Sequence, residues 1–465
     1  MSPTKRPLEE GFETAYATAL VGVDTLMGGD VGCPDGGAHF IADTFPKEEV
    51  ELPPIYEDAR SVKLREDGGM GAQHKAMVAS YINDYGLEGL QESLPAALPE
   101  NASEARRRFM ENLGRCLDVI ARTGIALAEV SALPPFEERY EAAARRAPKL
   151  VDTTELKERM RAVLDSAGVK IRQSETLREA IARWETQNGF IPAAEFGVLV
   201  DKANRDLTAL TRSKLFAGIN FDLSDFDPHL LDVSFDGCVF KTVSNVNYTG
   251  SSTFEGGVHP DGTPASKSLV ECNTDHSVTN IGLQYLVAHE IAPGHYMDSA
   301  VADLGWRTGR LGLEAVAHTM CTAETVMREG WAQNTLLALH GSERRLAGVF
   351  GPDQAVQALI ERLQDAGKNN ASILYQMQRV PIEEVRQHLR EECLLPEPIV
   401  QKLSGVWAQH PILGPMYGPA YHVGAEVVRQ AIEAHGPLAV AKVAFHTKGY
   451  TDIETFQMAM AGRAS

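Results

Sequence analysis

The chain has 465 residues, of which 44% are hydrophobic and 23% are charged, a composition typical of a globular protein with a large core. Its formal net charge of −19 argues against nucleic acid and against an anionic membrane as partners, because both would repel the protein. Solubility explains this acidity more simply than attraction of cationic substrates does.

The N-terminal segment and the cysteines indicate a compartment. No apolar run follows Lys5 and Arg6, so the N-terminus does not predict a secretory signal, and no uncharged apolar stretch is long enough to span a bilayer. The six cysteines are far apart and form no CxxC pair, which fits reduced thiols better than disulfides or a structural zinc site. We therefore expect a cytoplasmic protein.

The first part of the chain predicts helices joined by loops. Short apolar pieces broken by glycine and proline come first, and residues 68–74 are expected to form a surface turn rather than a ligand site. Helical spacing then predominates. Residues 109–120 carry a helical apolar stripe, residues 152–155 have N-cap chemistry, and a further helix is predicted over residues 193–216.

Between residues 218 and 273 the pattern changes to alternating β-branched and aromatic residues, which predicts two or three short strands separated by the glycine-rich loop FEGGVHPDG. Helical patterns return after residue 274. We predict a mainly α, multi-helix protein with a central cleft and a small β-sheet near the active-site helix. A mostly helical region, 1–217, should cover the cleft of a catalytic region, 218–465.

The fragment HEIAPGH, which contains His289, Glu290 and His295, carries the most informative chemistry. Two histidines and a later glutamate form the ligand set of a catalytic zinc site, and a glutamate beside the first histidine is where a metallohydrolase keeps its general base. Residues 279–292 are apolar almost all round and predict a buried helix. The polar side chains of His289 and Glu290 therefore need partners.

The spacing of the two histidines departs from the usual HExxH motif. Residues four apart share a helix face, but that position is Pro293 here, and His295 lies about 240° around an ideal helix from His289. Because Pro293 removes a backbone donor and Gly294 permits a wide turn, a distorted or bulged turn could bring His295 back over His289. The alternative is a helix that ends at the Pro-Gly pair with a capping histidine, and spacing alone slightly favours it.

HEIAPGH resembles the HExxPGH motif of a bacterial family called domain of unknown function 885, whose members resemble mostly helical zinc metallopeptidases of the gluzincin type. The tetrapeptide EGWA, which begins at Glu329, matches a second motif of that family. The resemblance covers roughly the C-terminal half of the chain. It implies that His289, His295 and Glu329 bind Zn²⁺ and that Glu290 is the general base.

The segment GPAYHVG resembles a third stretch of the same family. By analogy with related peptidases, Tyr421 or His422 donates a hydrogen bond to a developing oxyanion, and the alternative is a buried helix start with a satisfied tyrosine. The chain departs from the family pattern at Asp298, where a glutamine is expected, and many members are longer and exported. These departures leave the substrate open more than the metal.

Glu324 is an alternative third ligand. The spacing predicts one helix face that carries His318, Thr322, Thr325 and Glu329. Glu324 points away from that face, so the spacing favours Glu329 as the third ligand. His318 is then either a contact of the ligands or substrate, or simply a buried histidine, which we prefer.

Other candidates lie before the HEIAPGH helix. Asp275 and His276 could orient a substrate, but N-capping explains this part of the sequence without a function. Zinc peptidases commonly hold an extended peptide against an edge strand. The stretch KSLVECNT is a candidate for that edge, with Asn245, Asn247 and Tyr248 in the same cleft.

These patterns predict a zinc-dependent hydrolase that cleaves a peptide or related amide bond in a small substrate. Zn²⁺ would keep an open position for water, and Glu290 would take the proton of that water. The same ligand set suits Fe²⁺, so a biosynthetic enzyme with oxidative or lyase chemistry is the alternative. A non-catalytic binding protein on the same scaffold is less favoured, because it would not need Glu290.

Overall fold

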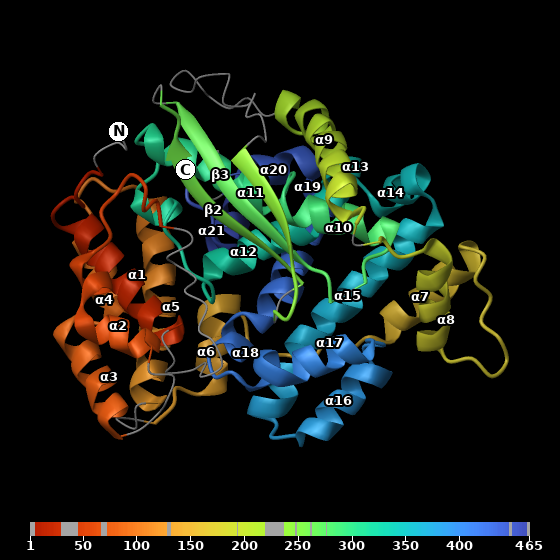
Figure 1. Cartoon of the computed structure of the whole chain (residues 1–465), viewed down its shortest axis with the longest axis horizontal. Coiled ribbons are helices and arrows are strands. Elements are labelled where there is room, and N and C mark those ends of the chain that lie inside the picture. The colour runs from red at the N-terminus through yellow and green to blue at the C-terminus, as the bar shows by residue number, and fades with distance from the viewer. Residues whose placement is uncertain are drawn as a thin grey trace.

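The described part of the chain is mainly α-helical and carries one small sheet, which confirms the predicted fold class (Figure 1). The computed structural model describes residues 5–28, 45–66, 72–127, 132–192, 194–218, 237–246, 249–260, 263–275, 277–445 and 449–462. The predictions made for Asn247, Tyr248 and His276 lie outside these residues, as does most of the stretch 68–74.

The N-terminal part of the described chain is helical. The predicted stripe lies in α5, where Phe109, Leu113 and Leu117 are buried. Helix α7 begins at Thr154, as the sequence predicts, but the side chain of its N-cap residue, Thr153, makes no capping hydrogen bond. The carboxylate of Asp152 instead accepts a hydrogen bond from the backbone N–H of Thr154 at 2.9 Å. The helices of this part are α1 (Phe12–Gly28), α2 (Ala59–Glu66), α3 (Ala72–Asp84), α4 (Leu90–Ala97), α5 (Glu104–Leu127), α6 (Phe136–Ala144), α7 (Thr154–Ser166), α8 (Leu177–Asn188) and α9 (Phe196–Lys214).

Three strands form the sheet, in the order β1-β3-β2: β1 (Cys238–Val243), β2 (Gly250–Val258) and β3 (Pro264–Asn273). β3 pairs in parallel with β1 and antiparallel with β2, so KSLVECNT lies in the central strand and the prediction that it forms an edge is wrong. The first residues of FEGGVHPDG belong to β2 instead of a loop. The strand continues through them because Gly256 and Gly257 adopt positive φ at a register shift.

Helices resume after the sheet, as predicted. They are α10 (Asn280–Glu290), α11 (His295–Arg307), α12 (Ala323–Gln333), α13 (Thr335–His340), α14 (Glu343–Phe350), α15 (Pro352–Ser372), α16 (Ile382–Glu391), α17 (Glu397–Lys402), α18 (Leu413–Met416), α19 (Ala425–His435), α20 (Pro437–Ala444) and α21 (Ile453–Met460). Three π-helical turns extend α15, α17 and α19: η6 (Ile373–Met377), η7 (Leu403–Trp407) and η8 (Ala420–Gly424).

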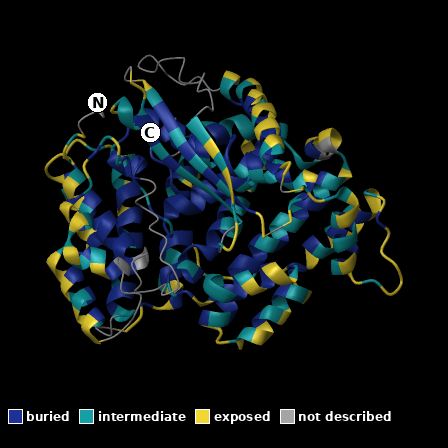
Figure 2. Cartoon of the chain, in the orientation of Figure 1, coloured by how far each residue is buried: buried dark blue, intermediate teal, exposed yellow. Residues whose placement is uncertain are grey.

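The largest hydrophobic core joins the two predicted regions. It includes Phe12 and Phe109 from the first region and Trp331 and Phe456 from the second. The hydroxyl of buried Tyr16 also donates a hydrogen bond to the carbonyl of Ala317. Figure 2 shows the buried residues gathered at the centre and the exposed residues on outer helices such as α3 and α9. The boundary at residue 217 therefore does not separate two cores.

Among the described residues, no helix has both the length and the apolar character needed to cross a membrane. The cysteines among the described residues are free thiols: Cys116, Cys238, Cys272, Cys321 and Cys393. Cys33 lies outside the described residues.

Candidate metal centre

Helix α10 carries His289 and Glu290 in its last turn. The helix begins where the Thr279 side chain accepts a hydrogen bond from the N–H of Gly282 at 2.9 Å. It ends at Glu290, because Ile291 leaves helical geometry with φ −118° and ψ −81°. The predicted helix therefore exists, and it is slightly shorter at its C-terminal end.

A four-residue turn, 291–294, brings the second histidine back to the first. The Ala292–Pro293 peptide bond is cis, and α11 begins directly afterwards at His295. The rings of His289 and His295 are perpendicular, with their centroids 4.7 Å apart. Helix α10 thus ends before the Pro-Gly pair, close to the alternative that spacing slightly favoured. His295 nevertheless returns to His289, from the start of a second helix and not through a bulged helical turn.

Gly294 makes this turn sterically feasible. A Cβ atom at this position would overlap the carbonyl oxygen of His289 and lie 2.5 Å from that of Ala288. Both are backbone atoms of α10, which cannot rotate aside as a flexible side chain would. Glycine is therefore required by the close approach of two backbone segments.

The EGWA tetrapeptide supports the same turn from α12. The indole N–H of buried Trp331 donates a hydrogen bond to the carbonyl of Pro293 at 2.9 Å. Trp331 thus connects the two motifs that the sequence treats separately, and it holds the turn against the helix that carries Glu329.

Glu329 faces both histidines. Its Oε2 atom lies 3.4 Å from His289 Nε2 and 3.6 Å from His295 Nε2. These three residues form a group whose potential ligand atoms all lie within 4.8 Å of one another. The structure therefore brings together the three predicted ligands, and Glu290 follows His289 on the same helix end.

The cluster fits a metal ion. Glu329 Oε2 is buried and has no hydrogen-bond partner among the described residues. Two ligand atoms that are each about 2.0–2.1 Å from a tetrahedral zinc ion are about 3.3 Å apart. The separations of 3.4 and 3.6 Å are too long for good hydrogen bonds but suit two atoms that share such an ion.

Glu324 and Asp298 lie in a different charge cluster. Arg328 Nε is 3.0 Å from Asp298 Oδ2, and Arg328 Nη1 is 3.5 Å from Glu324 Oε1. The alternative third ligand thus pairs with an arginine. His318 contacts the same arginine, at 3.2 Å, from a segment that precedes α12. The prediction that His318 shares a helix face with Glu329 is wrong. Helix α12 begins after Thr322, whose side chain caps it, so His318 lies before the helix.

Burial and the charges of the cluster shift the pKa values of the two glutamates in opposite directions. Burial raises the pKa of Glu290, although the nearby histidines act in the opposite direction. Burial also opposes ionisation of Glu329, but the two histidines outweigh it and hold the pKa of Glu329 well below its ordinary value. Glu329 is therefore an ionised group suited to bind a cation, and Glu290 has the raised proton affinity that a general base needs.

His289 responds to the same two carboxylates. Burial lowers the pKa of His289, but Glu329 and Glu290 outweigh burial, so the pKa is raised overall. A bound cation would take the place of the proton that these carboxylates favour on the imidazole.

Two tyrosines extend the cluster. Tyr417 donates a hydrogen bond from its hydroxyl to Glu329 Oε1 at 2.7 Å, and its oxygen lies 2.9 Å from the hydroxyl of Tyr421. Because the only proton of Tyr417 is used toward Glu329, Tyr421 donates to Tyr417. The Tyr421 ring stacks on that of His289 with centroids 6.4 Å apart. Sequence reasoning missed Tyr417, although it lies one helical turn before Tyr421.

A glycine–glycine contact holds the tyrosines near Glu329. A Cβ atom on Gly330 would overlap the backbone of Gly424, and one on Gly424 would overlap the carbonyl oxygen of Val326. The π-helical turn η8, which carries Tyr421, therefore packs directly against α12, which carries Glu329.

His422 does not join the site. It lies on η8 but does not line the cavity at the metal cluster. Burial lowers its pKa to about 4, and the charged groups around it are Glu426 and several arginines. Tyr421 is thus the residue of the predicted pair that faces the cluster.

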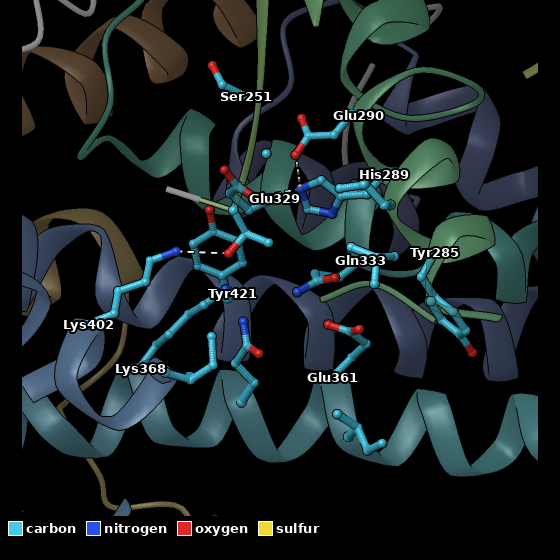
Figure 3. Close-up of a pocket in the computed structure, with 18 of the residues that line it drawn as sticks. Ser251, Tyr285, His289, Glu290, Glu329, Gln333, Glu361, Lys368, Lys402 and Tyr421 are labelled. Carbon is cyan, nitrogen blue, oxygen red and sulfur yellow. Dashed lines mark hydrogen bonds and ion pairs between the residues drawn. The ribbon is translucent and has the colours of Figure 1, made fainter. Parts of the chain in front are cut away.

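A cavity of about 820 Å³ lies against the cluster. Figure 3 shows Glu290, His289, Glu329 and Tyr421 converging on it. Its walls come from β2 and from helices α10, α12, α15 and α17, and the first region contributes α8 and Phe190. Asp275 lines the cavity and accepts a hydrogen bond from the backbone N–H of Asn245 at 2.6 Å.

Tyr417→Phe should weaken metal binding about 10–100-fold, because Glu329 loses the hydrogen bond that orients it. Titration against a competing chelator measures this change. Tyr421→Phe is the matched control, since the Tyr421 hydroxyl does not contact Glu329 directly. Equal affinities for the Tyr417→Phe variant and the wild type would show that Tyr417 does not position the ligand.

No family model matches the sequence, and a search of curated proteins gives no match. The structure is similar to that of a provisionally assigned lipoprotein from Colwellia psychrerythraea, with a TM-score of 0.50 and 12% identity over 87% of this chain and 72% of that chain. A provisionally assigned lipoprotein of unknown function from Shewanella oneidensis gives a TM-score of 0.47 and 14% identity, over 88% and 80% of the two chains. The first similarity shows the fold alone. The resemblance to the domain of unknown function 885 family stays a prediction.

Proposed function

We propose that the protein is a metal-dependent hydrolase that cleaves a peptide or related amide bond in a small substrate. The observation that carries the proposal is the grouping of His289, His295 and Glu329 beside Glu290, against a cavity of about 820 Å³. A His/His/Glu ligand set with an adjacent carboxylate is the arrangement that hydrolytic zinc sites use.

His289, His295 and Glu329 would hold Zn²⁺, which when bound supplies a Lewis acid for the substrate carbonyl and for a water molecule. Glu290 takes the proton of that water, since burial raises the pKa of its carboxyl. The same carboxyl then returns the proton to the leaving amine. Tyr417 keeps Glu329 oriented through their hydrogen bond.

Tyr421 would stabilise the carbonyl oxygen as negative charge develops on it. Burial and the charge of Glu329 raise the pKa of Tyr421 well above its ordinary value, so its hydroxyl keeps its proton. In the free protein this proton is directed at Tyr417, and rotation about the C–O bond redirects it to the substrate. A donor aimed at developing charge is worth about 10²–10³-fold in rate.

The edge strand β2 would align the substrate. Residues 250–254 of β2 line the cavity, and within the described sheet β2 pairs only with β3. An extended peptide can add to such an edge through main-chain hydrogen bonds. A Cβ atom on Gly250 would lie 2.5 Å from Glu290 Oε1, so the start of this strand is in close contact with the proposed base.

Metal analysis of the purified protein by plasma mass spectrometry tests the proposal. We expect about one zinc ion per chain in the wild type and in Glu324→Gln, and loss of zinc in His295→Ala and Glu329→Gln. Glu324→Gln is the matched control, because Glu324 lies on the same helix but pairs with Arg328. Circular dichroism of each variant separates loss of the ion from loss of the fold.

A protein with zinc justifies a screen of short peptides and amides for hydrolysis. No metal after reconstitution would refute the proposal. Stoichiometric iron would favour the alternative of oxygen-dependent chemistry at the same ligands.

A further inference from the structure

Two lysine side chains line the cavity beside the proposed metal centre. Lys368 belongs to α15, and Lys402 is the last residue of α17. Figure 3 shows both approaching Tyr421 from the side opposite His289. Lys368 is buried and Lys402 is half-buried, and an ammonium group removed from water is costly unless it pairs with an opposite charge or loses its proton.

The partners of the two lysines differ. Lys368 Nζ lies 3.4 Å from Asp365 Oδ1, and this carboxylate is shared with the side-chain amide of Gln333. Lys402 Nζ donates a hydrogen bond to Thr249 Oγ1 at 2.9 Å. Within the described part of the chain, no carboxylate forms an ion pair with Lys402. Lys402 is therefore the lysine of the pair whose ammonium group has no carboxylate of the described residues within ion-pair distance.

Both ammonium groups lie near the ring of Trp407, and Lys368 lies next to the proposed metal centre. They are 5.8 Å and 5.9 Å from the centroid of the same Trp407 ring, for Lys368 and Lys402 respectively. Lys368 Nζ is also 3.1 Å from the centroid of the Tyr421 ring. The ammonium group of Lys368 is therefore separated from His289 by the ring of Tyr421.

A bound anion would stabilise the charged form of Lys402. Burial and, to a smaller extent, the positive charge of Lys368 lower the pKa of Lys402 to about 7. An anion bound between the two groups would offset both effects, because an opposite charge within ~4–6 Å favours the ionised form.

We propose that Lys402, together with Lys368, binds a carboxylate of the substrate, so the hydrolase acts on peptides or amides that carry a free carboxylate. Peptides and related amides carry their negative charge as carboxylate, at the C-terminus or on a side chain. The identification of this anion as part of the substrate rests on the proposed function, but the anion subsite itself does not require the metal ion.

Binding by titration calorimetry tests the subsite without hydrolysis. The first pair of ligands is N-acetyl-Ala-Ala with a free C-terminal carboxylate and the same dipeptide as its C-terminal amide. The second pair is N-acetyl-glutamate α-amide and N-acetyl-glutamine α-amide, which differ only in a side-chain carboxylate. Each pair is measured with metal-loaded and with chelator-treated protein, because a carboxylate can also bind a metal ion directly.

The wild type should bind the acid about tenfold more tightly than the amide in at least one pair, in both metal states. The pair that shows this preference identifies the carboxylate as C-terminal or side-chain. The preference should fall below about threefold in Lys402→Met and recover in part in Lys402→Arg. Lys202→Met, at an exposed lysine of α9, should behave as the wild type.

Thr249→Val separates anion binding from a structural role of Lys402. This variant removes the hydrogen bond to Lys402 but keeps the ammonium group, so the preference for the acid should persist. Equal binding of acid and amide by the wild type in both pairs would refute the inference. So would an unchanged preference in Lys402→Met, or tighter binding of inorganic phosphate than of any carboxylate.

The two proposals fail separately. A Lys402-dependent preference without hydrolysis of any substrate would leave the carboxylate subsite standing and remove the hydrolase. Hydrolysis that is equally efficient for acids and amides would leave the hydrolase standing and remove the subsite.

Discussion

Replacing Glu290 with glutamine should abolish hydrolysis while the metal ion stays bound. Glutamine preserves the shape of the side chain but cannot take a proton from water, and loss of a positioned general base costs about 10²–10⁴-fold in rate. Glu290 is not one of the three residues grouped as ligands, so metal content should remain at the wild-type level. Measuring kcat/KM on a peptide or amide that the wild type cleaves, with metal analysis of the same sample, checks both parts.

Glu383→Gln is the control for this comparison. Glu383 is an exposed glutamate of α16, 69% accessible at its side chain, and it pairs with arginines of the same helix. Its replacement should leave both activity and metal content unchanged. If Glu290→Gln keeps activity within tenfold of the wild type, the proposed base is wrong. If it loses the metal ion instead, Glu290 belongs to the ligand set.

The grouping of His289, His295 and Glu329 was predicted from the resemblance of HEIAPGH and EGWA to two family motifs, whereas the spacing of the two histidines alone slightly favoured a helix that ends at the Pro-Gly pair. How the chain achieves this grouping could not be predicted. The turn depends on the closeness of Gly294 to the backbone of α10, and on a hydrogen bond from Trp331 to Pro293. Such contacts join residues distant in sequence, and a periodic pattern records only which face of an element is apolar.

Other predictions failed for similar physical reasons. Alternation predicts that a strand exists but not its neighbours, so KSLVECNT was placed at an edge although β3 is central. Glycines in FEGGVHPDG predicted a loop, but positive φ at Gly256 and Gly257 is accommodated within β2. Tyr417 was missed because a tyrosine in an apolar helix is usually core, and only its bond to Glu329 reveals its position.

Replacing Gly294 with alanine should also have a large effect. It should disrupt the metal centre by displacing the backbone of the turn 291–294. The added Cβ would overlap the carbonyl oxygen of His289, so the turn 291–294 must open. Opening separates the two histidine rings and breaks the hydrogen bond from Trp331 to Pro293. We expect metal affinity to fall at least about 100-fold, since a displaced ligand costs more than a lost orienting group. The free energy of unfolding should decrease by about 1–3 kcal/mol or more, as forced overpacking does.

Gly197→Ala shows what the same substitution costs where there is room. Gly197 lies in the first turn of α9, and a Cβ atom there would meet nothing within 4 Å. Alanine should therefore be neutral or stabilise by up to about 1 kcal/mol, because it favours the helix. Chelator competition and urea unfolding of both variants distinguish the two sites. Wild-type metal affinity in Gly294→Ala would mean that His295 reaches the cluster without this close approach. Lost metal with nearly unchanged stability would place the effect in the turn itself, since the core around it would then remain intact.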